Sequence, residues 1–329
     1  MLLRYVALLG VHFVVNFALL ADSVVVSHPV HHDDYTNLSQ SLREFDILSA
    51  RPVSTFGVAV LSRLGSSTAY VLLNLALVAC VLLSLRFVEL LARNGRALPA
   101  TGFLAAGALA LAFALVIDWT KYMGLVTNLT SALSGLTALC TLAAASIDPV
   151  RERRLAWAAV VIAAISFFAK EDFGLPIVLC AGVLAVQKRT RLWTIVACAM
   201  PALFAAALVF NREVGSVFVS GTLAPTDPYF VDLSPVSVVK SLAAMLLANG
   251  HAKAVVVAAT VAGALAVFMH RRNVPLALRL ALLPALAVGM LAGNSIFPNH
   301  AFAYYAFVPI ALLCASLAAF AYAIAGDEP

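Results

Sequence analysis

Apolar runs of about 20 residues recur from the first residue almost to the last, and this feature decides what the chain can fold into. Such a run is what an α-helix needs to cross the roughly 30 Å hydrocarbon core of a bilayer. Of the 329 residues, 63% are hydrophobic and 11% are charged, whereas soluble domains carry about 25% charged residues. The sequence predicts an all-α integral membrane protein, with one membrane domain over residues 1–329 and no soluble domain.

The apolar runs divide the chain into ten candidate spans. Counted as crossings, they place both termini on the same side of the membrane. The first run lacks a small residue three positions before the candidate cleavage point at Ala21, so we expect an uncleaved helix there. The ten spans are residues 2–26, 67–88, 100–117, 125–147, 155–169, 174–186, 192–210, 252–269, 281–291 and 307–324.

Basic and acidic residues separate across this arrangement. Thirteen of the 21 Lys and Arg residues fall on the side of the termini, whereas eleven of the 16 Asp and Glu residues fall on the opposite side. Because loops rich in Lys and Arg stay in the cytoplasm, we expect cytoplasmic termini and non-cytoplasmic polar loops. The net charge of +5 then follows from topology and indicates no nucleic acid partner. The Ala- and Leu-rich composition favours a bacterial inner membrane.

Two consecutive spans, 155–169 and 174–186, measure only about 20 to 22 Å as helices. They either cross the membrane or form a re-entrant hairpin, and in both cases the chain returns to the cytoplasmic side. Their shared tip carries Lys170, Glu171 and Asp172. Ionisable groups at membrane depth are costly unless they line a wet or functional cavity, so this tip is a candidate site.

The first outer loop, residues 27–66, is the longest polar segment. Apolar residues recur in it at helical spacing, which predicts an amphipathic helix on the membrane surface. Pro52 ends that helix, and a second amphipathic stretch over 53–64 leads into the next span. A further interfacial helix is expected near 235–247. The apolar residues of the first surface helix are Tyr35, Leu38, Leu42, Phe45 and Leu48.

The densest polar constellation stands at the start of this loop. It comprises His28, His31, His32, Asp33 and Asp34. Adjacent carboxylates at a membrane surface indicate a catalytic site, while capping of the following helix is the alternative. A zinc site is a second alternative, although the spacing matches no closed four-ligand pattern. The five cysteines lie in apolar runs without paired spacing, so we expect neither disulfides nor a metal set.

The order of these motifs resembles the GT-C superfamily of polytopic glycosyltransferases, including bacterial membrane glucosyltransferases that modify O-antigen. Asp33-Asp34-Tyr35 is similar to their acidic pair, which two juxtamembrane helices follow, and Arg51-Pro52-Val53 to their Arg-Pro element. The span with Asn74 and the turn around Lys170 and Glu171 also have counterparts. The aromatic loop at 300–309 resembles theirs before a late span. The likeness is strongest over 1–190, and 191–329 is more variable.

The resemblance implies a GT-C-like fold and transfer of a sugar from a polyprenyl-phosphate carrier on the outer face. It implies that Asp118 positions the donor or helps to hold a divalent metal ion, and an ordinary residue at a helix end is the alternative. It also implies that His300, Tyr304 and Tyr305 contact the sugar or carrier, although interfacial belt residues are the alternative. The acceptor is a lipid, glycan or protein. Many members carry a soluble C-terminal domain that this chain lacks, so membrane helices or a membrane partner protein must recognise the acceptor.

Sugar transfer from a phosphate requires a base for the acceptor hydroxyl and a clamp for the phosphate, but hardly a general acid. Asp33 or Asp34 can be the base, and a neighbouring carboxylate would raise its pKa toward working pH. The clamp candidates are the outer-side cations Arg51, Lys121, Lys170 and Arg212. For the two arginines, snorkelling anchors are the alternative. For Lys170 with Glu171, the alternative to a phosphate clamp is an internal ion pair.

Two other classes of function are compatible with the composition. A lipid or solute transporter or flippase needs polar groups near the midplane on paired broken helices, but beyond His12, Asn16 and Asn74 the spans are nearly bare. A membrane acyltransferase would use Arg4 and His12 of the first helix, and nothing else in the sequence supports that chemistry. A glycosyltransferase is therefore the leading expectation.

Overall fold

The computed structural model describes residues 1–20, 66–116, 126–210, 232–247, 250–296, 298 and 303–325. All regular structure in these residues is helical. The α-helices are α1 (Leu2–Leu20), α4 (Ser66–Ala92), α5 (Ala100–Val116), α7 (Val126–Ile147), α8 (Glu152–Ala169), α9 (Gly174–Lys188), α10 (Arg191–Phe210), α12 (Pro235–Leu247), α13 (Gly250–Met269), α14 (Val274–Ser295) and α15 (Phe307–Ile324). Two short 3₁₀ helices, η1 (Glu171–Phe173) and η3 (Ala303–Ala306), precede α9 and α15.

Six of these helices are long and apolar enough to cross a bilayer, namely α4, α7, α10, α13, α14 and α15. The chain is therefore an all-α, multi-pass membrane protein. The other four predicted spans also form helices, α1, α5, α8 and α9, and their crossing of the membrane stays a prediction. The interfacial helix expected near 235–247 is confirmed as a helix by α12. Residues 27–65 of the first outer loop, where two surface helices are predicted, lie outside the described residues.

Several helices, among them α4, α8, α9 and α14, are longer than the apolar pattern predicts. The span expected over 281–291 was too short, because α14 runs from Val274 to Ser295. Pro275 stands in its first turn, where no backbone N–H is needed, and Pro284 is accommodated inside the helix. α8 begins at Glu152 and α9 ends at Lys188, so they measure roughly 27 and 22 Å.

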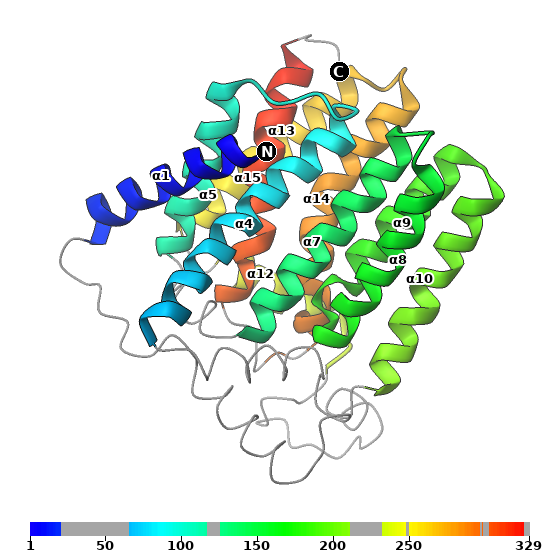
Figure 1. The fold of residues 1–329 in the computed structure, drawn as a ribbon, viewed down its shortest axis with the longest axis horizontal. Helices are drawn as coiled ribbons and strands as arrows, with labels where there is room; N and C mark the ends of the chain where they lie inside the picture. Colours follow the sequence, from blue (N-terminus) through cyan, green and yellow to red (C-terminus); the bar gives the residue numbers. More distant parts are fainter. Residues whose placement is uncertain are drawn as a thin grey trace.

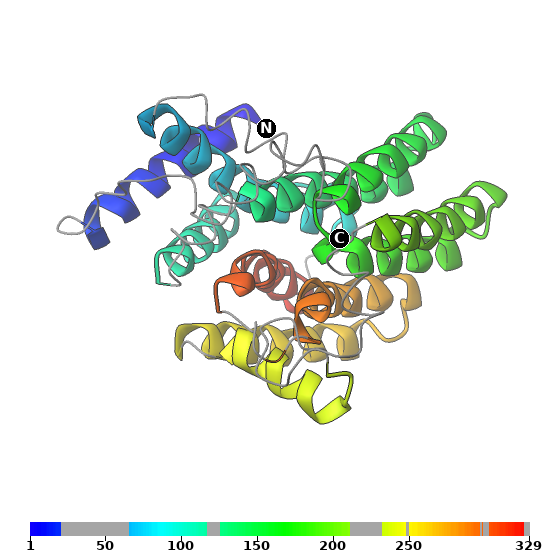
Figure 2. The same cartoon turned by 90° about the horizontal axis from the view of Figure 1, so that it is seen from below.

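The helices form two layers around α15 (Figures 1 and 2). One layer contains α4, α5, α7 and α8, and the other contains α13 and α14, with α12 beside them. α15 packs against α4, α5, α13 and α14, and most of its side chains are buried. α1 lies obliquely across α4 and α5, and α10 packs on the outside of α8 and α9 (Figure 1). All five cysteines are free, as expected.

One end of the bundle, here called the basic end, collects the N-terminus of α1, the C-terminal ends of α4, α9 and α15, and the N-terminal ends of α5, α8 and α14 (Figure 1). Contacts at this end, where α10 also begins and α13 ends, include Trp193 with Glu152, Arg279 with Gln187 and His270 with the carbonyl of Ala323. The thirteen basic residues assigned to the side of the termini fall in the helix ends and turns of this end. They are Arg4, Arg86, Arg93, Arg96, Arg151, Arg153, Arg154, Lys188, Arg189, Arg191, Arg271, Arg272 and Arg279.

Candidate functional site

The candidate site lies at the opposite end of the bundle, in the turn between α8 and α9. Lys170 leaves α8 in an extended conformation, and its N–H donates to the carbonyl of Ser166 at 3.0 Å. Its own carbonyl accepts a hydrogen bond from the Ser131 hydroxyl of α7 at 3.2 Å. Phe173 packs so closely on Gly135 of α7 that any side chain at 135 would overlap its ring. The backbone of the turn is therefore held against α7.

The ammonium of Lys170 is enclosed by groups from three parts of the chain. Its Nζ lies 2.7 Å from Oδ1 of Asn128 on α7 and 2.9 Å from Oδ2 of Asp172 in η1. It also lies 4.4 Å from the centroid of the Tyr305 ring in η3. Lys170 is only 5% exposed, and the Asp172 side chain is 13% exposed. A lysine, a carboxylate, an amide and an aromatic face thus form one buried polar cluster.

This arrangement suits a cation that can change partners. A buried ammonium is costly unless an anion balances its charge, and Asp172 supplies that charge here. Lysine is a compact point charge with three rotatable donors, so a phosphate oxygen can replace a carboxylate oxygen beside it. The face of Tyr305 contributes a further cation–π interaction without adding charge.

The structure describes three of the ten predicted site residues at least in part. Lys170 is buried and paired with Asp172, an internal ion pair of the kind that was the alternative to a phosphate clamp, and its contact with a donor phosphate stays a prediction. Glu171 lies in η1 and Tyr304 in η3, next to Tyr305, but their side chains lie outside the description. The other seven predicted site residues lie entirely outside the described residues: Asp33, Asp34, Arg51, Asp118, Lys121, Arg212 and His300. The base and the other clamp residues stay predictions.

Sequence reasoning missed Asn128, which contacts Lys170 directly. The available signal was its spacing from Ser131, since both residues are polar and residues three apart share one helix face. Ser131 and Asn128 indeed both contact Lys170, one at its carbonyl and the other at its ammonium. Tyr305, which was considered with Tyr304 as a sugar or carrier contact, has its ring against Lys170.

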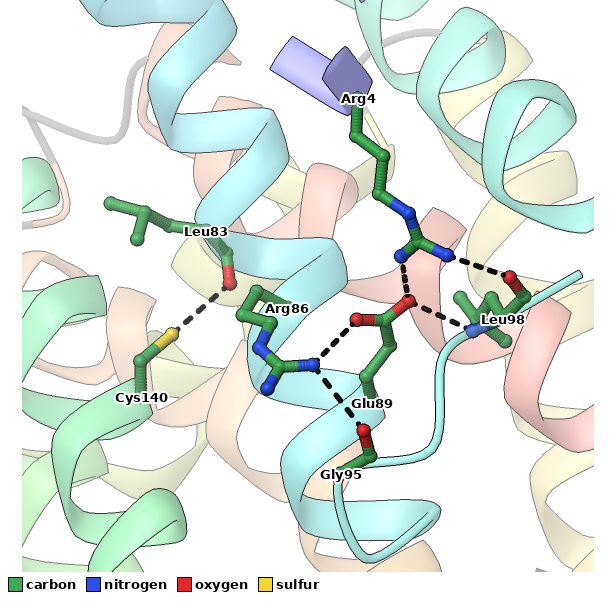
Figure 3. Close-up of polar contacts among 7 residues, drawn as sticks. All are labelled: Arg4, Leu83, Arg86, Glu89, Gly95, Leu98 and Cys140. Carbon is green, nitrogen blue, oxygen red and sulfur yellow. Dashed lines mark hydrogen bonds and ion pairs between the residues drawn. The ribbon is translucent and has the colours of Figure 1, made fainter. Parts of the chain in front are cut away.

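A second buried charge cluster, also unforeseen, lies at the basic end (Figure 3). Glu89 of α4 is 1% exposed and accepts hydrogen bonds from Arg4 of α1, from Arg86 at 2.9 Å and from the N–H of Leu98 at 2.8 Å. Arg4 also donates to the Leu98 carbonyl at 3.1 Å, and Arg86 to that of Gly95 at 3.4 Å. One carboxylate therefore ties α1, α4 and the turn before α5 together. The pattern Arg86-x-x-Glu89 at the end of a span was the available signal.

Arg4 and His12, the pair considered for acyl transfer, contact α4 at two separate places. Arg4 meets Glu89, and Nε2 of His12 lies 2.9 Å from Oδ1 of Asn74. In the part of the chain that the structure describes, no group of three or more His, Cys, Asp or Glu side chains is arranged to hold a metal ion. The histidines of the first loop lie outside that part.

Comparison with known proteins finds no matching family model, no matching curated protein and no matching solved structure.

Proposed function

We propose that the chain is a glycosyltransferase that moves a sugar from a polyprenyl-phosphate carrier to a lipid, glycan or protein acceptor on the non-cytoplasmic face of the membrane. The observation that supports this most is the buried ammonium of Lys170, held at the end opposite the basic end by Asp172. A cation in that position can receive a lipid-linked phosphate. The order of motifs that resembles GT-C enzymes suggests that this phosphate belongs to a polyprenyl-phosphate sugar.

The proposed reaction is a direct displacement at the anomeric carbon. Asp33, or its neighbour Asp34, removes the proton of the acceptor hydroxyl, and the acceptor oxygen forms a bond to the anomeric carbon. The bond from that carbon to the phosphate oxygen breaks, and the electron pair leaves with polyprenyl phosphate. Lys170 stabilises the charge that grows on the phosphate, and the configuration at the anomeric carbon inverts. Arg51, Lys121 and Arg212 are further candidates for the phosphate clamp.

The proposal includes a topology in which all ten predicted spans cross, both termini are cytoplasmic and the membrane is a bacterial inner membrane. Cysteines introduced at Gln40 and Thr226 should then react with an impermeant thiol reagent in intact cells. As a matched control, Val150→Cys, in the exposed turn between α7 and α8, should react only after lysis. The reverse pattern of labelling would invert the topology, and labelling of all three sites in intact cells would leave it without support.

The function is tested by incubating the purified chain with a panel of labelled polyprenyl-phosphate sugars and candidate acceptors. We expect one or more donors to release polyprenyl phosphate in step with sugar transfer. A flippase or transporter would move the donor across a vesicle membrane and leave its sugar–phosphate bond intact. Movement without cleavage across the whole panel would contradict the proposal.

A further inference from the structure

Among the described residues, Arg93 has no ion-pair partner, although two of its guanidinium nitrogens are buried. It follows the last residue of α4 at the basic end, and its guanidinium carbon lies 5.0 Å from the ring centroid of Tyr322 on α15. Its Nε and Nη1 atoms are buried and have no hydrogen-bond partner among the described residues. An aromatic face and the C-terminal end of a helix both favour a cation. In the described residues, neither accepts a hydrogen bond from these two atoms.

The nearest buried carboxylate on the same helix is already committed. Glu89 stands one turn before Arg93, and its two oxygens are used by Arg4, Arg86 and the N–H of Leu98. The described residues of this corner therefore hold more positive than negative charge. An excess of partly buried guanidinium groups where helices meet the membrane surface is characteristic of sites for anionic lipid headgroups.

We propose that the corner formed by the end of α4, the start of α5 and the end of α15 binds the phosphate of an anionic phospholipid through Arg93. Tyr322 packs on Gly102 in the first turn of α5, where an added Cβ would lie 3.1 Å from the tyrosine hydroxyl. This close contact brings the three helix ends together beneath Arg93. Arg93 itself is only half-buried, so a headgroup can approach it from outside.

A lipid is favoured over a free phosphate ion because apolar surface continues from the corner along α5. Leu104 and Leu109 of α5 are 37% and 44% exposed, and Ala105 between them is also exposed. These residues recur at helical spacing on one face. Because α5 begins at the basic end, its exposed apolar face runs from the level of the lipid headgroup toward the membrane interior. An acyl chain can pack along this face. The site therefore combines a cation for the phosphate with an apolar surface for the acyl chain.

The test compares thermal midpoints of the full chain in neutral phosphatidylcholine, with and without phosphatidylglycerol. We expect phosphatidylglycerol to raise the midpoint of the wild type and of the control Arg272→Gln, an exposed arginine at the same end. Arg93→Gln should lose most of that increment and bind phosphatidylglycerol about tenfold more weakly, because one charge-assisted contact is removed. Arg93→Lys, which keeps the charge, should retain part of the increment. Inorganic phosphate alone should leave the midpoint unchanged.

Three results would overturn the proposal. The first is an equal phosphatidylglycerol increment in Arg93→Gln and Arg272→Gln. The second is an increment that inorganic phosphate reproduces without lipid. The third is a thermal midpoint of the wild type that phosphatidylglycerol leaves unchanged. If Arg93→Gln does not fold, the wild type still decides, because an increment that survives high salt would exclude a charge-based headgroup site.

Discussion

Replacing Lys170 by methionine is expected to weaken binding of a polyprenyl-phosphate donor about ten- to a hundredfold, the value of one or two charge-assisted hydrogen bonds. Methionine keeps the length and apolar stem of lysine and removes only the charge and the donors. In the unliganded protein Lys170 is paired with Asp172 at 2.9 Å. A donor phosphate must therefore take the place of the Asp172 carboxylate beside Nζ. Affinity is measured by titration with labelled donor in detergent.

Asp172→Asn separates a phosphate contact from a purely structural ion pair. Lys170→Met and Asp172→Asn each leave one buried charge without its partner, so both variants should have lower thermal midpoints. Only Lys170→Met should lose donor affinity, whereas Asp172→Asn should bind the donor as well as the wild type or more tightly, because a competing anion is removed. Lys240→Met makes the same change at an exposed site on α12 and should alter neither quantity. Unchanged donor affinity in a destabilised Lys170→Met protein would refute the contact.

Replacing Glu89 by glutamine should destabilise the protein by about 3 kcal/mol, at the lower end of the range for breaking a buried ion pair. The change removes the negative charge that balances Arg4 and Arg86 and keeps the size of the side chain. The lower end is expected because these arginine side chains are 31% and 35% exposed, so water compensates part of the loss. The measurement is the midpoint of unfolding in detergent, which should fall by several degrees.

The control is Glu152→Gln, the same change in a glutamate that accepts a single hydrogen bond from Trp193. An amide oxygen can still accept that bond, so the cost there should stay below about 1 kcal/mol. Combining Glu89→Gln with Arg4→Gln should cost less than the sum of the two single changes, since both remove one interaction. Equal costs at 89 and 152, or strict additivity, would show that Glu89 is not the charge that joins α1 to α4.

Apolar periodicity predicted most of the helices, because in a membrane chain the backbone has no other way to satisfy its hydrogen bonds. It failed at element ends. The predicted span over 281–291 began after Arg279, yet Arg279 is accommodated inside α14 by the side chains of Gln187 and Asn94. Those acceptors come from α9 and from the turn after α4, so their proximity depends on packing that no local pattern reveals.

The candidate site was predicted only in part, because some of its contacts also depend on packing that no local pattern reveals. The charges of the α8–α9 turn stood out because ionisable residues are rare at membrane depth, and Lys170 was recognised on that basis. Asn128 lies 42 residues before Lys170 in the sequence and Tyr305 lies 135 residues after it, yet both contact Lys170 in the fold. Glu89 looked like one of several acidic residues at the basic end. Its importance arises from the approach of Arg4, 85 residues away.

The central claim is sugar transfer from a polyprenyl phosphate with an aspartate of the first outer loop as base. It is tested most directly by the rate of polyprenyl phosphate release from a labelled donor by the wild type, Asp33→Asn and Asp34→Asn. We predict rapid release by the wild type and none above background by Asp33→Asn, with all three proteins folded and inserted. Loss in Asp34→Asn alone would move the base by one residue. Full release by both variants would contradict an aspartate base and leave helix capping as the role of the pair.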